Sequence, residues 1–125
     1  MATINLNKDN FREHYESAEI LLVDFWAAWC GPCQNFLPIY EKLSDEYPDI
    51  VFGKVDTDVE QELAQHFFIR SIPTILVIRE GYEVFLSPGS PSEDEMRQLI
   101  QKVKDLDMEE VRKKLDAEDA DSEEN

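Results

Sequence analysis

The stretch that most constrains the fold is EILLVDFWA, residues 19–27, an almost unbroken apolar run. A strand with one buried face alternates apolar and polar residues, whereas a strand covered on both faces is apolar throughout. The run therefore predicts a central strand with helices packed on both sides. One residue departs from the pattern, because Asp24 places a carboxyl group inside a segment that should be buried.

The segments around this strand alternate in type. Helical spacing of apolar residues predicts helices over Asn7–Tyr15, Pro32–Tyr47, Glu60–Phe67 and from Ser92 to Leu106. A second strand is predicted over Ile50–Asp58, and TILVIREGYEVFL is predicted to be a hairpin that turns at Glu80-Gly81. Strands that alternate with helices and end in a hairpin indicate an α/β fold with a mixed sheet.

Length and charge limit the classes of function. The 125 residues suit one domain, and the formal net charge of −16 argues against nucleic acid or an anionic membrane as a partner. No apolar run approaches the roughly 18 residues that a membrane span needs. The N-terminus lacks the basic and apolar parts of a signal peptide, which predicts a cytoplasmic location. We also expect a monomer.

The charge is concentrated at the C-terminus. Residues 105–125 carry ten acidic and three basic side chains. We therefore divide the chain into a domain over residues 1–106 and an acidic extension over residues 107–125. Asp107 with Glu110 can cap one short helix, and the residues after that helix are predicted to be disordered. Such an extension is usually a solvated appendage, and the alternative is an arm that docks a basic partner.

The only two cysteines, Cys30 and Cys33, follow the buried strand directly. A zinc or iron–sulfur site would need further ligands, and His14 and His66 lack a suitable spacing to the pair. A purely structural disulfide closing so small a loop would stabilise the fold little. Two inert buried thiols would not require Gly-Pro between them. A C-x-x-C pair between a strand and a helix instead favours redox chemistry.

The position of the pair explains how it would react. Cys30 would lie at the start of a helix, where free N–H groups and the helix dipole favour a thiolate. A cysteine in this setting commonly titrates near 7, against about 8.5 for a free thiol. Pro32 at the helix start costs no hydrogen bond. Cys33 would lie on the same helical face, within disulfide reach and buried.

Asp24 fits the same chemistry. Burial in a covered strand should raise the pKa of its carboxyl group, which could then accept the proton of Cys33. Lys54, on the neighbouring predicted strand, could pair with Asp24 and moderate that rise. The alternative is that Asp24 turns outward into solvent.

At this point the sequence resembles the thioredoxin family. The matching residues are VDFWA, WCGPC from Trp29 to Cys33, Pro38 in the following helix, KVDTD with Lys54, SIPT with Pro73, and Gly89. They occur in the family's order and spacing across roughly residues 3–106. The resemblance implies a thioredoxin fold, with a central five-stranded mixed β-sheet flanked by four α-helices.

The resemblance also implies how targets bind. Pro73 would be cis and packed against the disulfide, and the Ile72 backbone would pair with an extended segment of the target. Trp29, Gly31, Pro32 and Gly89 would form a flat apolar rim around the site.

The implied activity is reduction of protein disulfides by dithiol–disulfide exchange. The Cys30 thiolate would attack the target, and Cys33 would resolve the mixed disulfide with help from Asp24. No bound cofactor or metal is implied beyond the redox-active Cys30–Cys33 disulfide. The implied partners are an NADPH-linked thioredoxin reductase as electron source and disulfide-bearing proteins as substrates.

Two departures from the family pattern stand out. Gln34 follows the second cysteine, where lysine or arginine is common. Phe68 occupies a helix-to-strand corner where many relatives have glycine, so that corner is either built differently or holds Phe68 in a costly conformation.

Two alternative functions remain. One is a thioredoxin-like oxidant or isomerase, against which stand the missing signal peptide, the Gly-Pro between the cysteines and Ile72 before the proline. The other is a non-catalytic binding module that uses the thioredoxin surface as a platform for a subunit or chaperone.

Overall fold

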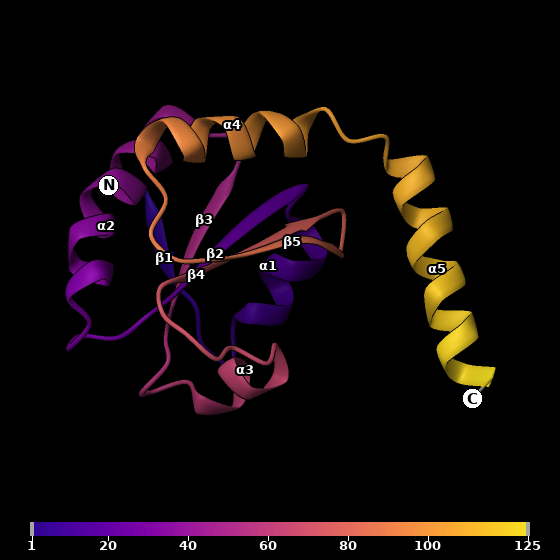
Figure 1. The fold of residues 1–125 in the computed structure, drawn as a ribbon, viewed down its shortest axis with the longest axis horizontal. Coiled ribbons are helices and arrows are strands. Elements are labelled where there is room, and N and C mark those ends of the chain that lie inside the picture. Colours follow the sequence, from indigo (N-terminus) through magenta and orange to yellow (C-terminus); the bar gives the residue numbers. More distant parts are fainter. Residues whose placement is uncertain (1, 125) are drawn as a thin grey trace.

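The computed structural model describes residues 2–124, which form one sheet with helices on both faces (Figure 1). The strands are β1 (Thr3–Asn5), β2 (Ile20–Trp26), β3 (Val51–Asp56), β4 (Thr74–Arg79) and β5 (Tyr82–Pro88). Their order across the sheet is β1-β3-β2-β4-β5. β2 is parallel to β3 and antiparallel to β4. The predicted α/β fold with a five-stranded mixed sheet is therefore confirmed.

The helices are α1 (Phe11–Ser17), α2 (Gly31–Glu46), α3 (Gln61–His66), α4 (Glu93–Lys104) and α5 (Met108–Glu124). The described residues thus contain five helices: α1 to α4, the four expected in the domain, and α5 in the extension, where a short helix was predicted. The additional helix, α5, lies in the acidic extension and projects beyond the sheet at the β5 side (Figure 1).

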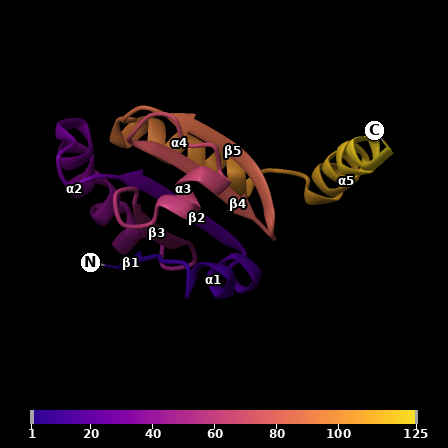
Figure 2. The same ribbon diagram turned by 90° about the horizontal axis from the view of Figure 1, so that it is seen from below.

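The central strand β2 separates two apolar layers. Ile20 and Leu22 pack with residues of α2 and α4 on one face, while Leu21 and Val23 pack with Phe11 of α1 on the other. Figure 2 shows α2 and α4 on one side of the sheet and α1 on the other. The prediction of a strand covered on both faces is confirmed. By the same alternation, Asp24 points to the α2 face.

Short-range signals in the sequence set several element boundaries. Glu80 and Gly81 both have positive φ, as a two-residue hairpin turn requires, and they join β4 to β5. At the start of α4, the Ser92 hydroxyl accepts from the Glu95 N–H while the Glu95 carboxylate accepts from the Ser92 N–H. Both the predicted turn and the predicted cap are present.

The acidic extension is ordered as a longer helix than predicted. α5 continues to Glu124, where a short helix followed by disorder was expected, and the prediction for Asn125 lies outside the described residues. Asp107 accepts from the N–H groups of Glu109 and Glu110, so the predicted cap is formed. Good helix formers such as Leu115 and Ala117 continue the helix beyond that cap.

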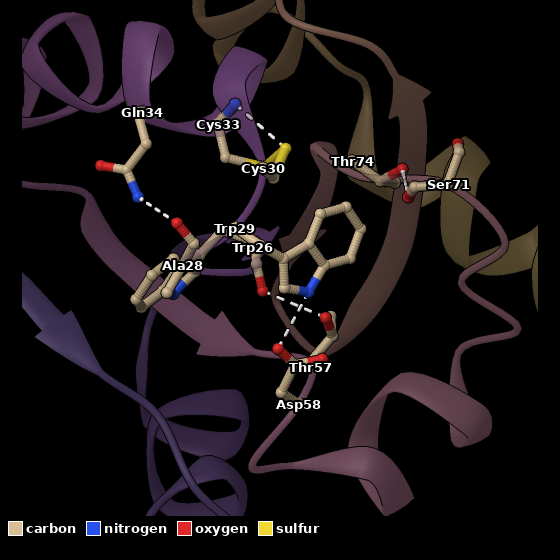
Figure 3. The surroundings of a disulfide bond; sticks show 10 residues. All are labelled: Trp26, Ala28, Trp29, Cys30, Cys33, Gln34, Thr57, Asp58, Ser71 and Thr74. Carbon is tan, nitrogen blue, oxygen red and sulfur yellow. Dashed lines mark hydrogen bonds between the residues drawn. A yellow bond between two sulfur atoms is a disulfide. The ribbon is translucent and has the colours of Figure 1, made fainter.

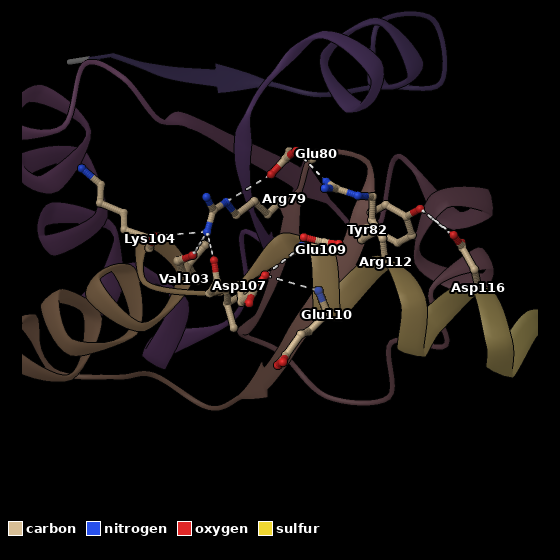
Figure 4. Close-up of polar contacts among 11 residues, drawn as sticks. Arg79, Glu80, Tyr82, Val103, Lys104, Asp107, Glu109, Glu110, Arg112 and Asp116 are labelled. Carbon is tan, nitrogen blue, oxygen red and sulfur yellow. Dashed lines mark hydrogen bonds and ion pairs between the residues drawn. The ribbon is translucent and has the colours of Figure 1, made fainter.

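Polar contacts attach the extension to the hairpin (Figure 4). Arg79 donates from one nitrogen to the carbonyls of Val103, Lys104 and Leu106, where α4 ends. Glu80 pairs with Arg112 of α5 at 3.0 Å. The hairpin turn therefore holds both the end of α4 and the first turns of α5.

Candidate active site

Cys30 and Cys33 are joined by a disulfide at the N-terminus of α2, with their Cα atoms 5.2 Å apart. Cys30 is the N-cap residue, and its Sγ accepts from the Cys33 N–H at 3.2 Å (Figure 3). This places the Cys30 sulfur against the unpaired N–H groups of the first helical turn, as the sequence predicted. Pro32 lies within that turn, where its missing N–H costs nothing.

Asp24 is buried beneath this pair, with 1% of its surface exposed. Its Oδ1 has no hydrogen-bond partner among the described residues. Loss of water around the carboxylate raises the pKa of Asp24 from 3.8 to about 7, and the charge of Lys54 partly opposes this rise. The expected inward position and raised pKa of Asp24 are therefore both found, and the solvent-facing alternative is not.

Asp24, Cys33 and Lys54 line one small cavity of about 20 Å³ together with Trp26, Gln34 and Leu37. Lys54 lies directly opposite Asp24 in the parallel pairing of β2 with β3. Its ammonium group also lies over the Trp26 ring, 5.9 Å from the ring centroid. The fold thus brings the second cysteine, the buried acid and the lysine together, although 30 residues separate Asp24 from Lys54 in the sequence.

Trp29 is the most exposed aromatic residue beside the disulfide, at 73%. Its indole N–H donates to Asp58 Oδ2 at 3.0 Å (Figure 3). Asp58 comes from the loop after β3, and Thr57 in the same loop donates to the Trp26 carbonyl through both its N–H and its hydroxyl. These contacts fix the loop after β2 to the loop after β3.

The predicted target-binding residues approach the disulfide from the other side. The Ile72–Pro73 peptide bond is cis, and Ile72 packs against the cluster of Ala27, Cys30 and Cys33. Gly89 donates its N–H to the Pro73 carbonyl at 2.9 Å. Gly89 has φ +97, a conformation that favours glycine strongly. Gly31 and Pro32 are exposed at the start of α2.

Sequence reasoning missed the supporting residues Asp58, Thr57 and Trp26. Trp26 belongs to the apolar run expected to be buried, whereas it is partly exposed and lines the cavity beside Asp24. The position of the KVDTD segment carried a usable signal. Because parallel strands end at the same edge of a sheet, the residues after β3 had to lie near those after β2.

Comparison with known proteins identifies the family. The thioredoxin family model matches residues 2–102. This chain belongs to the thioredoxin family. It is 49% identical over 112 residues to "Putative thioredoxin 2" of Streptomyces coelicolor, covering 90% of this chain and 84% of that protein. It is 36% identical over 103 residues to the thioredoxin of Bacillus subtilis, covering 82% of this chain and 98% of that protein.

Solved structures of thioredoxins match the fold as well. A mutant thioredoxin from Halobacterium salinarum has a TM-score of 0.78 and 30% identity, covering 83% of this chain and 92% of that one. The thioredoxin of Plasmodium falciparum has a TM-score of 0.74 and 35% identity, covering 79% of this chain and 97% of that one. The thioredoxin fold implied by the sequence is therefore confirmed.

Family membership and the paired cysteines together define the activity. The protein is a thiol–disulfide oxidoreductase that reduces protein disulfides through Cys30 and Cys33. Among the side chains that the structure describes, no three potential metal ligands of the His, Cys, Asp and Glu types come together. No helix in that same part of the chain combines the length and apolar character needed to cross a membrane.

Proposed function

We propose that this thioredoxin family member is a cytoplasmic electron donor to protein disulfides, in which Asp24 accepts the proton of Cys33. The observation that carries the proposal is the shared cavity of Asp24 and Cys33, combined with the raised pKa of about 7 for the buried carboxyl group. A carboxyl group that titrates near neutral pH can both accept and return a proton.

The reaction takes two exchange steps. In the reduced protein, the Cys30 thiolate attacks one sulfur of the target disulfide, and the other target sulfur leaves as a thiolate. Cys33 then loses its proton and attacks the Cys30 sulfur. This releases the second target sulfur as a thiolate and forms the Cys30–Cys33 disulfide. Two electrons pass from the protein to the target.

The proton step depends on the space between Cys33 and Asp24. A cavity of about 20 Å³ can hold one water molecule, which would bridge the thiol and the carboxylate. Lys54 stabilises the ionised carboxylate through its charge, since it lowers the pKa of Asp24 against the effect of burial. Asp24 is the proton acceptor in this proposal, and Lys54 tunes it.

Target binding is assigned to the surface around the disulfide. Trp29, Gly31, Pro32 and Gly89 form the exposed rim, and Ile72 offers its backbone beside the cis Pro73. An extended target segment would pair with this backbone as an added strand. The exposed Trp29 ring supplies apolar contact area next to Cys30.

The dithiol must be regenerated after each cycle. Thioredoxins are generally reduced by a thioredoxin reductase, and we assign an NADPH-linked enzyme of that type as the electron source. A reduction potential near the −270 mV of thioredoxin would suit electron donation in a reducing cytosol. A measured potential near −180 or −120 mV would instead indicate an isomerase or an oxidant.

Insulin reduction with dithiothreitol tests the proposal. We expect wild-type protein to accelerate the reaction and Cys30→Ser to abolish the acceleration. Cys33→Ser should accumulate a mixed disulfide with its target, because it lacks the resolving thiol. Equal rates for wild-type and Cys30→Ser would favour the non-catalytic platform, and would overturn the assignment.

A further inference from the structure

Large exposed apolar side chains are few in the described residues. They are Trp29, Val59, Phe68 and Leu86. Val59 and Phe68 bracket α3. Leu86 of β5 pairs with Leu76 of β4, whose side chain packs in the layer on the α1 side of the sheet. Because directly paired residues point to the same face, Leu86 also lies on that face.

Phe68 carries two energetic costs at one position. Its φ of +55 lies in the left-handed region, which is unfavourable for a residue other than glycine. Its side chain is also 79% exposed, so its ring gains little from burial. The backbone around Phe68 forms the hydrogen bonds that end α3. The Phe68 N–H donates to the Gln65 carbonyl, and the Ile69 N–H donates to the Ala64 carbonyl. A glycine would serve that turn without this cost, which makes the exposed ring a candidate for binding.

The segment that ends at Phe68 is fixed to the active site at its other end. Asp58 precedes Val59 and accepts the hydrogen bond of the Trp29 indole. Thr57 holds the Trp26 carbonyl. The surface along α3 is therefore a direct continuation of the surface that carries Cys30.

A groove follows α3. Two hollows of about 610 and 310 Å³ share Lys8, Glu62 and Leu63, so they adjoin along the helix. Val59 lines the smaller hollow, and the larger one has an aromatic floor of Phe11 and Phe67. Leu63 of α3 is only partly buried: it packs against the apolar layer on the α1 side and also lines both hollows. An apolar floor of this size suits peptide side chains.

We propose that the α3 docking surface, comprising Val59, Leu63 and Phe68, binds an apolar segment of a protein substrate while Cys30 attacks that substrate's disulfide. The occupant follows from continuity with the site, since a polypeptide held at Cys30 has only to continue past Trp29 to reach Val59. Ten extended residues span up to about 35 Å, which gives ample reach. A second copy of this chain is a poorer occupant, because two molecules of net charge −16 repel each other.

The inference rests on the proposed function, because its occupant is a disulfide-bearing protein. The experiment compares a protein substrate, insulin, with a small disulfide, 5,5′-dithiobis(2-nitrobenzoic acid), which is too small to span both sites. The variants are Phe68→Gly and Val59→Ser. Phe68→Tyr is the matched control, because it keeps both the ring and the backbone cost.

We expect Phe68→Gly to lower kcat/KM for insulin about three- to tenfold, as for a moderately important interface residue. Val59→Ser should act in the same direction, and Phe68→Tyr should stay within about twofold of wild-type. The rate with the small disulfide should follow wild-type in all three variants. Folding is not at risk in Phe68→Gly, because glycine favours the φ found there.

Three results would overturn the inference. Unchanged insulin kinetics in both Phe68→Gly and Val59→Ser would remove the docking role. An equal loss with both substrates would place the effect on Cys30 itself. A wild-type dimer that Phe68→Gly dissociates would make the surface a self-interface. Failure of wild-type protein to reduce insulin at all would instead refute the proposed function, before any variant is compared.

Discussion

The buried end of β2 and the C-terminal extension both present carboxyl groups, in opposite settings. Asp24 is a single acid with 1% exposure, and burial raises its pKa to about 7. Residues 105–125 hold ten acids. Exposed examples such as Asp116 and Glu118 lie on the surface of α5. The environment of a carboxyl group, rather than the number of acids, therefore decides whether it can move a proton.

Removing the buried acid should give the largest effect. In Asp24→Asn the proton acceptor is lost, and resolution of the mixed disulfide at pH 7 should slow by about a hundredfold. The wild-type rate should rise with pH through about 7 as the carboxyl group ionises, and the variant should lack that step. Stopped-flow measurement of mixed-disulfide decay from pH 5 to pH 9 checks both expectations. If the pH profile of Asp24→Asn matched that of wild-type, a group other than Asp24 would accept the proton of Cys33.

The same buried carboxyl group should make the stability of the wild-type protein depend on pH. Because the folded pKa of Asp24 is raised from 3.8 to about 7, the protein is favoured below pH 3.8 and loses stability as the pH rises through 7. The full loss is up to about 4 kcal/mol, at about 1.4 kcal/mol for each pKa unit.

In Asp24→Asn this pH-dependent loss should disappear. Urea denaturation at pH 5 and pH 8 measures the difference for each protein. If the stabilities of wild-type and Asp24→Asn changed equally between pH 5 and pH 8, Asp24 would not be desolvated in solution. Because other acids titrate as well, the informative quantity is the difference between the two proteins at each pH.

In the extension, removing an apolar contact should lower the free energy of unfolding more than removing a charge. Met108, at the start of α5, is 6% exposed, so Met108→Ala should lower the free energy of unfolding by about 2 kcal/mol. The rate with a small disulfide should be unchanged, because Met108 does not line the active-site cavity. Chemical denaturation and a thiol assay on the same protein check this pair. A loss of activity in Met108→Ala would show that the extension influences the active site.

The smallest effect is expected for the ion pair between α5 and the hairpin. Arg112 and Glu80 lie 3.0 Å apart with side chains 43% and 37% exposed. Arg112→Ala should therefore cost less than about 1 kcal/mol, and less still at high salt. Lys113→Ala is the matched control, since the ion pair of Lys113 is with Glu109 of its own helix. Thermal melts at low and high salt compare the two variants, and a larger loss in Lys113→Ala would contradict this account.

The sequence predicted the parts that depend on neighbours in the chain. The apolar run around Asp24 indicated a strand buried on both faces, and the Glu80-Gly81 turn and Ser92 cap follow from local geometry. Predicting the role of the C-x-x-C pair required only that it lie between a strand and a helix. These features depend on a few consecutive residues, so their physical cause can be read from the sequence.

Other features could not be predicted in that way. The helix of residues 7–15 was placed too early, because the Asn7 side chain instead accepts from the N–H groups of Asp9 and Asn10 in a turn before α1. The length of α5 was underestimated, because its acidic composition favoured disorder while its anchors, Glu80 and Tyr82, lie in a distant hairpin.

The sequence alone determined where the reactive sulfur sits, since Cys30 follows a buried strand and begins a helix. It also placed Asp24 in a strand expected to be buried, while the structure excluded the alternative that its side chain turns outward. Only the tertiary structure decided that Asp58 would hold Trp29, that Asp24 and Cys33 would share a cavity, and that Phe68 would remain exposed. The physical reason is range: helix starts and turns arise from bonds between neighbouring residues, whereas a cavity or an exposed face depends on how distant segments pack.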